Sequence, residues 1–254
     1  MTPDNHPFSL NRAAAGKQIP VWLCAALLLM AFGAVAQNSR PPIKFVDRLL
    51  PQQSSARAAS NVVDHLVLHF CSDVIAHPDH PYDIDRQIEI FQQAPASANY
   101  LIARNGTVYR LVPEDRVAWH AGNGHLPWDP ALKSMNQKAI GIEMFAVGSP
   151  ADMKLFGMSQ AQYDAFKSKH PDWVGFSDAQ YTTLNQLIDE IRARHPAILH
   201  DRFHIIGHEE WAGRARRTDP GQLFDWIRIG LTRERSAARP SAAFSPWGMA
   251  FLES

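Results

Sequence analysis

The segment Ala139–Val147 (AIGIEMFAV) constrains the fold more than any other part of the chain, because Glu143 is its only polar side chain. An apolar run of this length predicts a strand buried at the centre of a sheet. A carboxylate without a partner is unfavourable in such a place. The segment therefore predicts a central core strand in which Glu143 is either an ion-paired structural residue or a functional one.

Shorter strands and helices alternate on either side of this run. Four further strands are predicted, at Val62–Phe70, Tyr100–Ala103, Thr107–Val112 and Phe203–Ile206. The Asn105-Gly106 pair predicts a hairpin between the second and third of them. Helices are predicted at Ile84–Phe91, after the capping residue Ser177, and at Gln222–Ile229. This alternation indicates an α/β fold, and we expect a single domain with a central mixed β-sheet flanked by helices.

The first 36 residues have the composition of a secretory signal peptide. Arg12 and Lys17 precede the apolar run Val21–Ala36, which ends in a small-residue sequence typical of a cleavage site. We expect residues 1–36 to be removed and the mature protein to be periplasmic or secreted, with no membrane span after cleavage. An uncleaved anchor is the alternative, because the run is near the lower limit for crossing a bilayer.

The rest of the chain divides by composition. Residues 37–60 are rich in Pro, Ser, Gln and Ala, and predict an extended linker or a segment that wraps around the domain. The folded domain is expected at residues 61–232, with 148–176 as an inserted, partly helical loop. Residues 233–254 are predicted to form a loosely ordered C-terminal tail.

Charge and cysteine content narrow the class of protein. Removal of residues 1–36 takes away two of 25 basic and one of 25 acidic residues, which leaves 218 residues with a formal charge of −1. A near-neutral chain gives no electrostatic reason to expect binding of nucleic acid. Cys71 is the only cysteine left, so no intramolecular disulfide is possible and stability must come from the core or from a metal. We expect a monomer.

The segment HIIGHEEWAGRARRTDPGQLFDW, residues 204–226, contains two candidate metal ligands. His208 follows a short β-like run, and Asp219 comes eleven residues later in a rigid Asp-Pro-Gly turn. Asp219 also suits the role of a helix N-cap, which does not exclude metal binding. The four-residue spacing of His200, His204 and His208 would align them on a helix, but the apolar run before Gly207 favours a strand. His204 is therefore expected to be structural.

A hydrolytic zinc site needs a third protein ligand, an open position for water, a base and a positive group for the developing oxyanion. His69, at the end of the first predicted strand, is the candidate third ligand, and Glu143 is the candidate base. Arg217 is the candidate oxyanion partner, or else a solvated member of an arginine run. Cys71 follows two residues after His69 and is expected to be a small buried thiol; as a fourth ligand it would close the site.

Five segments carry a family resemblance in one consistent order: LVLHF, SANYLIARNGTVYRLV, RVAWHAG, NQKAIGIEM and GHEEWAGRARRTDPGQLFDW. With them the chain resembles, over residues 62–230, the zinc-dependent N-acetylmuramoyl-L-alanine amidases of the amidase-2 type, which share their fold with peptidoglycan recognition proteins. The resemblance implies His69, His208 and Asp219 as Zn²⁺ ligands and Glu143 as the catalytic carboxylate. It also implies hydrolysis of the amide between N-acetylmuramic acid and L-alanine in peptidoglycan or muropeptides.

Two positions depart from the family pattern. Asn99 stands where many members carry histidine, and Arg217 stands where lysine is usual, which keeps the charge but changes the donor geometry. We expect Asn99, Trp119 and His120 to bind substrate. For His120, a buried histidine that orients a loop is the alternative.

Three functions are consistent with the sequence. The first is a zinc amidase that acts in cell-wall remodelling or recycling. The second is a non-catalytic module that binds peptidoglycan, since a fold alone does not settle function. The third is a zinc hydrolase of another amide. The presence of all three candidate ligands together with Glu143 favours the enzyme.

Overall fold

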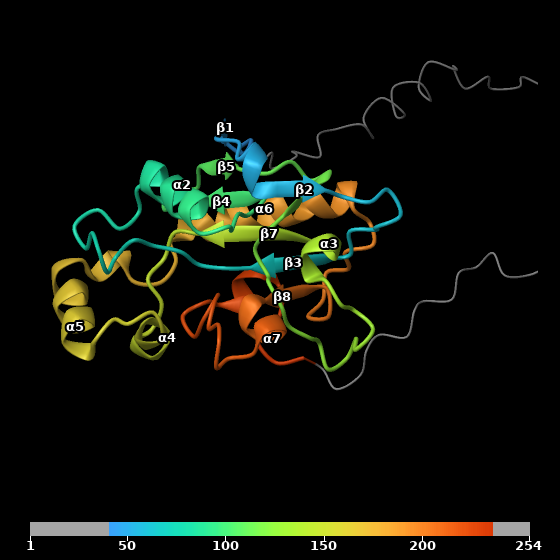
Figure 1. Cartoon of the computed structure of the whole chain (residues 1–254). Helices are drawn as coiled ribbons and strands as arrows, with labels where there is room; N and C mark the ends of the chain where they lie inside the picture. The colour runs from blue at the N-terminus through green and yellow to red at the C-terminus, as the bar shows by residue number, and fades with distance from the viewer. Residues whose placement is uncertain (1–40, 236–254) are drawn as a thin grey trace, which may run out of the picture. The chain divides into compact units, whose positions relative to one another are not determined.

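The computed structural model describes residues 41–235 (Figure 1). The described residues from Ile43 to Arg235 belong to one compact unit. The predicted signal peptide and nearly all of the predicted tail lie outside the described residues. Within the described range, no helix is long and apolar enough to cross a membrane.

Six strands form the main sheet, in the order β1-β5-β4-β7-β3-β8. Their bounds are β1 Phe45–Asp47, β3 His65–Leu68, β4 Tyr100–Ile102, β5 Val108–Arg110, β7 Ala139–Met144 and β8 Ile205–Gly207. The β4–β5 pair is antiparallel, as the Asn-Gly hairpin predicts, and the other pairs are parallel. The mixed sheet and the central place of β7 are therefore confirmed.

One face of the sheet is covered by helix α6 (Asp178–Arg194), which begins after a capping box between Ser177 and Gln180. Its apolar stripe joins a core cluster with alternate residues of β3 and β7: Leu66, Leu68, Ile140, Ile142 and Met144. Because side chains alternate along a strand, the residues between these point to the other face. Helix α2 (Ile84–Gln93) packs on that other face through Phe91, which lies with Leu101 and Phe145.

The remaining elements are short. They are strands β2 (Ser54–Ala56) and β6 (Arg116–Ala118), which pair antiparallel, helices α3 (Met135–Lys138), α4 (Pro150–Leu155), α5 (Gln160–Lys169) and α7 (His208–Ala212), and 3-10 turns η2 (Pro51–Gln53), η3 (Pro171–Trp173) and η4 (Trp226–Ile229). Residues 148–176 are thus partly helical, as expected. That they are an insertion stays a prediction.

The predicted helix Gln222–Ile229 is wrong, because only the 3-10 turn η4 forms there. The side chain of Asp225 accepts a hydrogen bond from Ile227 N, and this cap starts the turn at Trp226. Phe224 and Trp226 are both buried in the core cluster under α6. Burial of these two aromatic rings, rather than helical propensity, determines the path of the chain.

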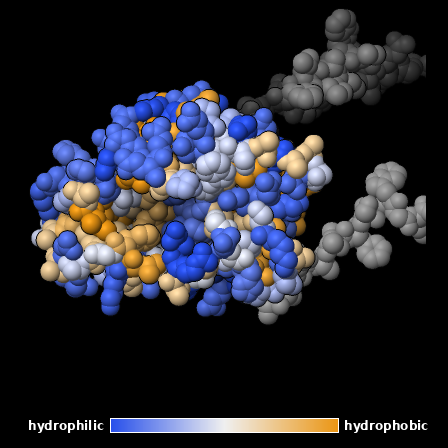
Figure 2. Space-filling view, in the orientation of Figure 1, coloured by the Kyte–Doolittle hydropathy of each residue, from blue (hydrophilic) through white to orange (hydrophobic). Residues whose placement is uncertain are grey.

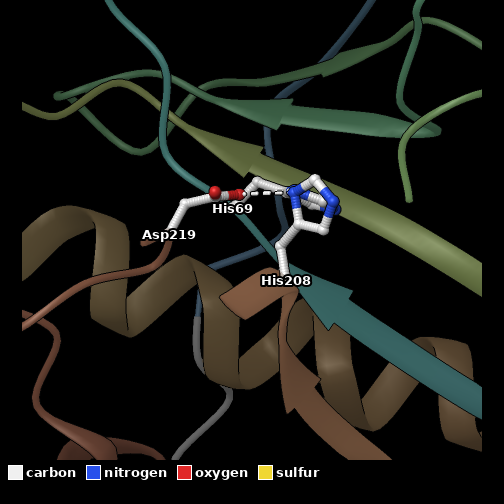
Figure 3. Close-up of side chains that lie close together, drawn as sticks. All are labelled: His69, His208 and Asp219. Atoms are coloured by element: carbon white, nitrogen blue, oxygen red, sulfur yellow. Dashed lines mark hydrogen bonds and ion pairs between the residues drawn. The ribbon is translucent and has the colours of Figure 1, made fainter. Parts of the chain in front are cut away.

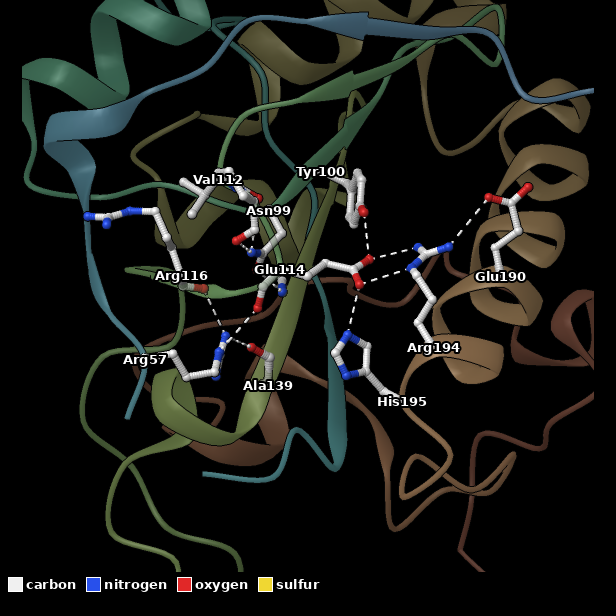
Figure 4. A network of polar contacts seen from close by, with 12 residues as sticks. Arg57, Asn99, Tyr100, Val112, Glu114, Arg116, Ala139, Glu190, Arg194 and His195 are labelled. Carbon is white, nitrogen blue, oxygen red and sulfur yellow. Dashed lines mark hydrogen bonds and ion pairs between the residues drawn. The ribbon is translucent and has the colours of Figure 1, made fainter. Parts of the chain in front are cut away.

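Of the two alternatives for residues 37–60, the structure shows the wrapping segment for residues 45–57. Strand β1 pairs with β5 and strand β2 pairs with β6, so this part wraps onto the domain. Arg57 fastens it (Figure 4): its guanidinium donates to the carbonyl oxygens of Glu114, Arg116, Gln137 and Ala139 at 2.5 to 3.2 Å. A short polar segment cannot be distinguished from a linker by composition when its partners are backbone groups elsewhere in the chain.

Replacement of Arg57 with methionine is expected to lower the free energy of unfolding by about 2–4 kcal/mol, because several carbonyl oxygens lose their donors. Urea denaturation followed by circular dichroism measures this loss. Arg110→Met is the matched control, since Arg110 is exposed and pairs with Asp47, and it should cost less than about 1 kcal/mol. Equal losses in the two variants would contradict the role given to Arg57.

Candidate metal and catalytic site

Three parallel strands end side by side at the candidate site. Leu68 in β3 pairs with Ile142 in β7 and with Gly207 in β8. His69 directly follows β3, and His208 directly follows β8 as the first residue of α7. Ligands bind at the carboxyl ends of the strands in open α/β sheets, and the structure brings the candidate residues to this edge.

Asp219 joins the two histidines (Figure 3). Its Oδ2 atom lies 2.8 Å from His69 Nδ1 and 3.0 Å from His208 Nδ1. One possible ligand atom from each residue lies within 4.8 Å of the others, and all three side chains are buried. These are the three residues that the sequence predicts as ligands.

The hydrogen bonds of His208 favour a positive ion between this histidine and the Asp219 carboxylate. His208 Nε2 lies 3.0 Å from the carbonyl oxygen of Ala121, which can only accept, so Nε2 carries a proton. In a neutral imidazole, Nδ1 then presents a lone pair toward the Asp219 carboxylate, and a proton or a metal ion is needed between them. Asp219 Oδ1 is buried without a hydrogen-bond partner among the described residues. Two imidazoles and one carboxylate fit a zinc ion with one position left open.

The pKa shifts at these residues also suit a metal site, because ligands must be deprotonated. Burial lowers the pKa of His69 to about 4, against the opposing effect of Asp219. Burial alone would raise the pKa of Asp219, but hydrogen bonds with His208 and His69 outweigh it and hold that pKa below its usual value. At pH 7 the set is therefore a neutral His69 imidazole beside an ionised carboxylate.

His120 packs against the candidate ligand His69. Its Nδ1 lies 3.1 Å from His69 Nε2, and the two rings meet edge to face. The ring lies over Gly141 in β7, where a Cβ atom would come within 2.5 Å of it, so only glycine leaves room. The side-chain oxygen of Asn136 accepts hydrogen bonds from the backbone N–H groups of His120 and Ala121. This geometry favours the orienting role for His120; its contact with substrate stays a prediction.

Glu143 is a buried acidic side chain whose pKa is strongly raised. It points to the face of β7 opposite α6, and its Oε2 atom is buried without a hydrogen-bond partner among the described residues. Burial raises the pKa of Glu143 to about 8, and the charge of Asp219 adds to this, while Cys71 and Arg217 lower it. Within the described range no basic side chain forms an ion pair with Glu143, which disfavours the structural interpretation. Strongly raised pKa values of this kind are typical of functional sites.

In the metal-free protein, stability is expected to fall with rising pH because of Glu143. Its pKa rises from an ordinary value of 4.5 to about 8 on folding. The stability that protonated Glu143 contributes to the folded protein is therefore complete below pH 4.5, and it is lost as the pH rises through 8. The glutamine side chain of Glu143→Gln stays neutral at every pH. As the pH rises from 5 to 9, the free energy of unfolding of this variant should therefore increase by roughly 1–3 kcal/mol relative to that of the wild type.

Urea denaturation in the presence of a chelator measures this gain. The pKa of Asp219 shifts in the opposite direction, but Asp219 is present in both proteins. The difference in stability between the two proteins therefore reports the pH dependence that Glu143 causes. A difference in stability that does not change with pH would contradict the shift.

The structure leaves Arg217 at the margin of the site. Its side chain is exposed and donates to the carbonyl oxygen of Arg216. Its charge nevertheless acts on the pKa values of His69 and Glu143, so it lies close enough to influence both. Contact of Arg217 with an oxyanion therefore stays a prediction.

Cys71 is a free thiol beside Glu143, and it is not among the described residues that converge as ligands. Burial raises the pKa of this thiol well above its usual value, so it stays protonated. It lines a hollow of about 310 Å³ whose walls include Phe70, Ile75 and Phe156. Figure 2 shows hydrophobic surface in this region, around α4 and α5.

The burial and hydrogen bonds of Asn99 disfavour the expected contact of this residue with substrate. The residue is fully buried, its amide donates to the carbonyl oxygen of Val112, and its Oδ1 accepts from Gly141 N. The amide also donates to the carbonyl oxygen of Pro113 at 3.4 Å, so the side chain joins β7 to the end of β5 and has no donor left for a ligand. Trp119 is half-buried and its indole N–H lies 3.5 Å from Ser55 Oγ in β2; its contact with substrate stays a prediction.

Two contributors to the site were not foreseen. The carbonyl oxygen of Ala121 fixes the tautomer of His208, and no side-chain pattern can reveal a backbone acceptor. Asp152 hydrogen-bonds the turn that carries Asp219, through Gln222 N. The capping-box spacing from Ser149 to Asp152 was the one available signal for a buried role of Asp152.

A family model described as N-acetylmuramoyl-L-alanine amidase matches residues 59–222. The chain is 35% identical over 149 residues to the 1,6-anhydro-N-acetylmuramyl-L-alanine amidase AmpD of Haemophilus influenzae, covering 59% of this chain and 62% of that protein. It is 28% identical over 217 residues to the N-acetylmuramoyl-L-alanine amidase AmiD of Escherichia coli, covering 82% of this chain and 66% of that protein. The matches therefore span less than two thirds of the length of these relatives.

The fold is similar to that of a solved complex. This is E. coli AmiD with the substrate anhydro-N-acetylmuramic acid-L-Ala-D-gamma-Glu-L-Lys, with a TM-score of 0.50 and 25% identity. The similarity covers 71% of this chain and 63% of that one.

Proposed function

Because this chain belongs to the N-acetylmuramoyl-L-alanine amidase family, we propose that it is a zinc-dependent hydrolase of the amide between N-acetylmuramic acid and L-alanine in peptidoglycan or muropeptides. One observation carries the proposal: His69, His208 and Asp219 converge beside Glu143, a carboxylate with a raised pKa and no ion-pair partner in the described range. A module that only binds peptidoglycan has no need of this group.

The residues divide the chemistry as follows. His69, His208 and Asp219 would hold Zn²⁺, which would supply a Lewis acid for the carbonyl of the scissile amide. Glu143 takes a proton from the attacking water and delivers it to the leaving nitrogen of L-alanine. A nearby cation favours the charged form of a carboxylate. A metal ion bound to the three ligands would therefore lower the pKa of Glu143 below the value of about 8 that it has without the ion. Arg217 stabilises the oxyanion that forms as water adds.

The relatives suggest the substrate class. AmpD is named for 1,6-anhydro-N-acetylmuramyl-L-alanine, and the solved AmiD complex holds an anhydro-muropeptide. We therefore propose that soluble anhydro-muropeptides are cleaved as well as intact peptidoglycan. The predicted signal peptide at residues 1–36 supports action in the periplasm or outside the cell.

Mass spectrometry of reaction products tests the function directly. Purified residues 37–254 would be incubated with intact sacculi and, separately, with soluble anhydro-muropeptides, and the zinc content would be measured on the same preparation. The expected products are peptides with a free N-terminal L-alanine and sugars that retain the lactyl carboxylate. Binding of muropeptides without cleavage, in protein that contains zinc, would support the binding module instead.

A further inference from the structure

Asp152 in α4 is a buried carboxylate with no basic partner. It is 3% exposed, and no lysine, arginine or histidine in the range 41–235 forms an ion pair with it. A buried charge is unfavourable unless it is fully hydrogen-bonded. The interactions that Asp152 makes instead show what the carboxylate holds in place.

The Oδ2 atom of Asp152 links two segments that are far apart in the sequence. It accepts hydrogen bonds from Ser149 N at 2.9 Å and from Ser149 Oγ at 2.7 Å, which complete the capping box of α4. It also accepts from Gln222 N at 3.0 Å. Gln222 stands three residues after the candidate ligand Asp219, so the third bond reaches the turn that carries this ligand.

The ligand turn and α4 fit closely together. Gly221 has φ +81°, and a Cβ atom there would lie 2.7 Å from Asp152 Oδ2, so the turn approaches the carboxylate through a residue that has no side chain. At the other end of the turn, Glu209 N donates to the carbonyl oxygen of Asp219 at 2.9 Å. The turn 219–222 is thus fixed by α7 on one side and by α4 on the other.

We propose that Asp152 is a positioning residue for the metal site, and that it holds the 219–222 turn so that the Asp219 carboxylate faces His69 and His208. The inference rests on the proposed zinc site and extends it to residues 148–176. Groups that orient metal ligands without touching the metal typically change metal affinity 10- to 100-fold when removed.

The neighbouring helix α5 offers a matched control. Its capping box has the same hydrogen bonds, between Ser159 and Gln162, at 2.8 to 3.3 Å. Gln162 is exposed, and its side chain hydrogen-bonds only with Ser159 among the described residues. Gln162→Ala therefore removes an equivalent cap without touching the ligand turn.

The experiment measures the Zn²⁺ affinity of residues 37–254 by competition with a chromogenic chelator, with thermal unfolding recorded for every variant. Asp152→Ala should bind Zn²⁺ about 10- to 100-fold more weakly than the wild type. Asp152→Asn should lose less Zn²⁺ affinity than Asp152→Ala, because its amide oxygen can still accept the hydrogen bond from Gln222 N. Gln162→Ala should keep the wild-type affinity even if its stability falls.

The inference is overturned if Asp152→Ala binds Zn²⁺ as the wild type does, or if Gln162→Ala weakens binding as much as Asp152→Ala. Should the alanine variant fail to fold, Asp152→Leu, which is close in size and has no acceptor for Gln222 N, takes its place, and wild-type Zn²⁺ affinity in that variant would overturn the inference equally. A wild-type protein that binds no Zn²⁺ overturns it too. Zinc binding without amide cleavage would contradict the proposed function alone and leave the role of Asp152 standing.

Discussion

Replacement of Glu143 with glutamine is expected to lower kcat by about 10²- to 10⁴-fold, while the protein still folds and binds Zn²⁺. Glutamine keeps the shape of the side chain but cannot take a proton from water. The three candidate ligands lie outside the substitution, so metal content should not change. Product formation from anhydro-muropeptides, followed by mass spectrometry, measures the rate, and the zinc content of the same sample shows that the site is intact.

Glu114→Gln is the control for this variant. Glu114 is also a largely buried glutamate, but it accepts hydrogen bonds from Tyr100 and Arg194 and pairs with His195, away from the metal ligands (Figure 4). Its loss is expected to reduce stability and to leave kcat of the folded protein unchanged. If Glu143→Gln has the kcat of the wild type, Glu143 is not the general base of the reaction.

Replacement of Asp219 with alanine is expected to abolish both metal binding and activity. Its carboxylate is the only negative group of the candidate ligand set and lies within 3.0 Å of both imidazoles. The fall in Zn²⁺ affinity should exceed the roughly 10- to 100-fold loss that is typical when a residue that only orients a metal ligand is removed. Because a ligand that binds only the folded state stabilises it, Zn²⁺ should raise the Tm of the wild type but not that of the variant.

Asp201→Ala is the matched control for Asp219. Asp201 makes a similar pair with a histidine, at 2.7 Å from His204 Nδ1, but it precedes β8 instead of following it. Zn²⁺ should stabilise this variant as it stabilises the wild type. If Zn²⁺ still raises the Tm of Asp219→Ala, Asp219 is not a ligand.

Much of the fold could be predicted because the signals are local. The apolar run around Ile142 predicts the central strand, the Asn105-Gly106 pair predicts the β4–β5 hairpin, and Ser177 marks the start of α6. Prediction was ambiguous for residues 45–57 and wrong for the helix at 222–229, because both segments depend on distant partners. Residues 45–57 join the domain through strand pairing and Arg57, and residues 222–229 follow the burial of Phe224 and Trp226.

The sequence by itself determined which residues could form a site: two histidines at or just after the end of a predicted strand, an aspartate in a rigid turn, and a glutamate in the middle of the central strand. Only the tertiary structure decided that they converge, because His69 and Asp219 are 150 residues apart and meet where β3, β7 and β8 end together. It also decided that Asn99 joins strands and that Asp152 holds the ligand turn. The physical reason is that a polar side chain acts through the partner it meets, and for these residues that partner is supplied by distant parts of the chain.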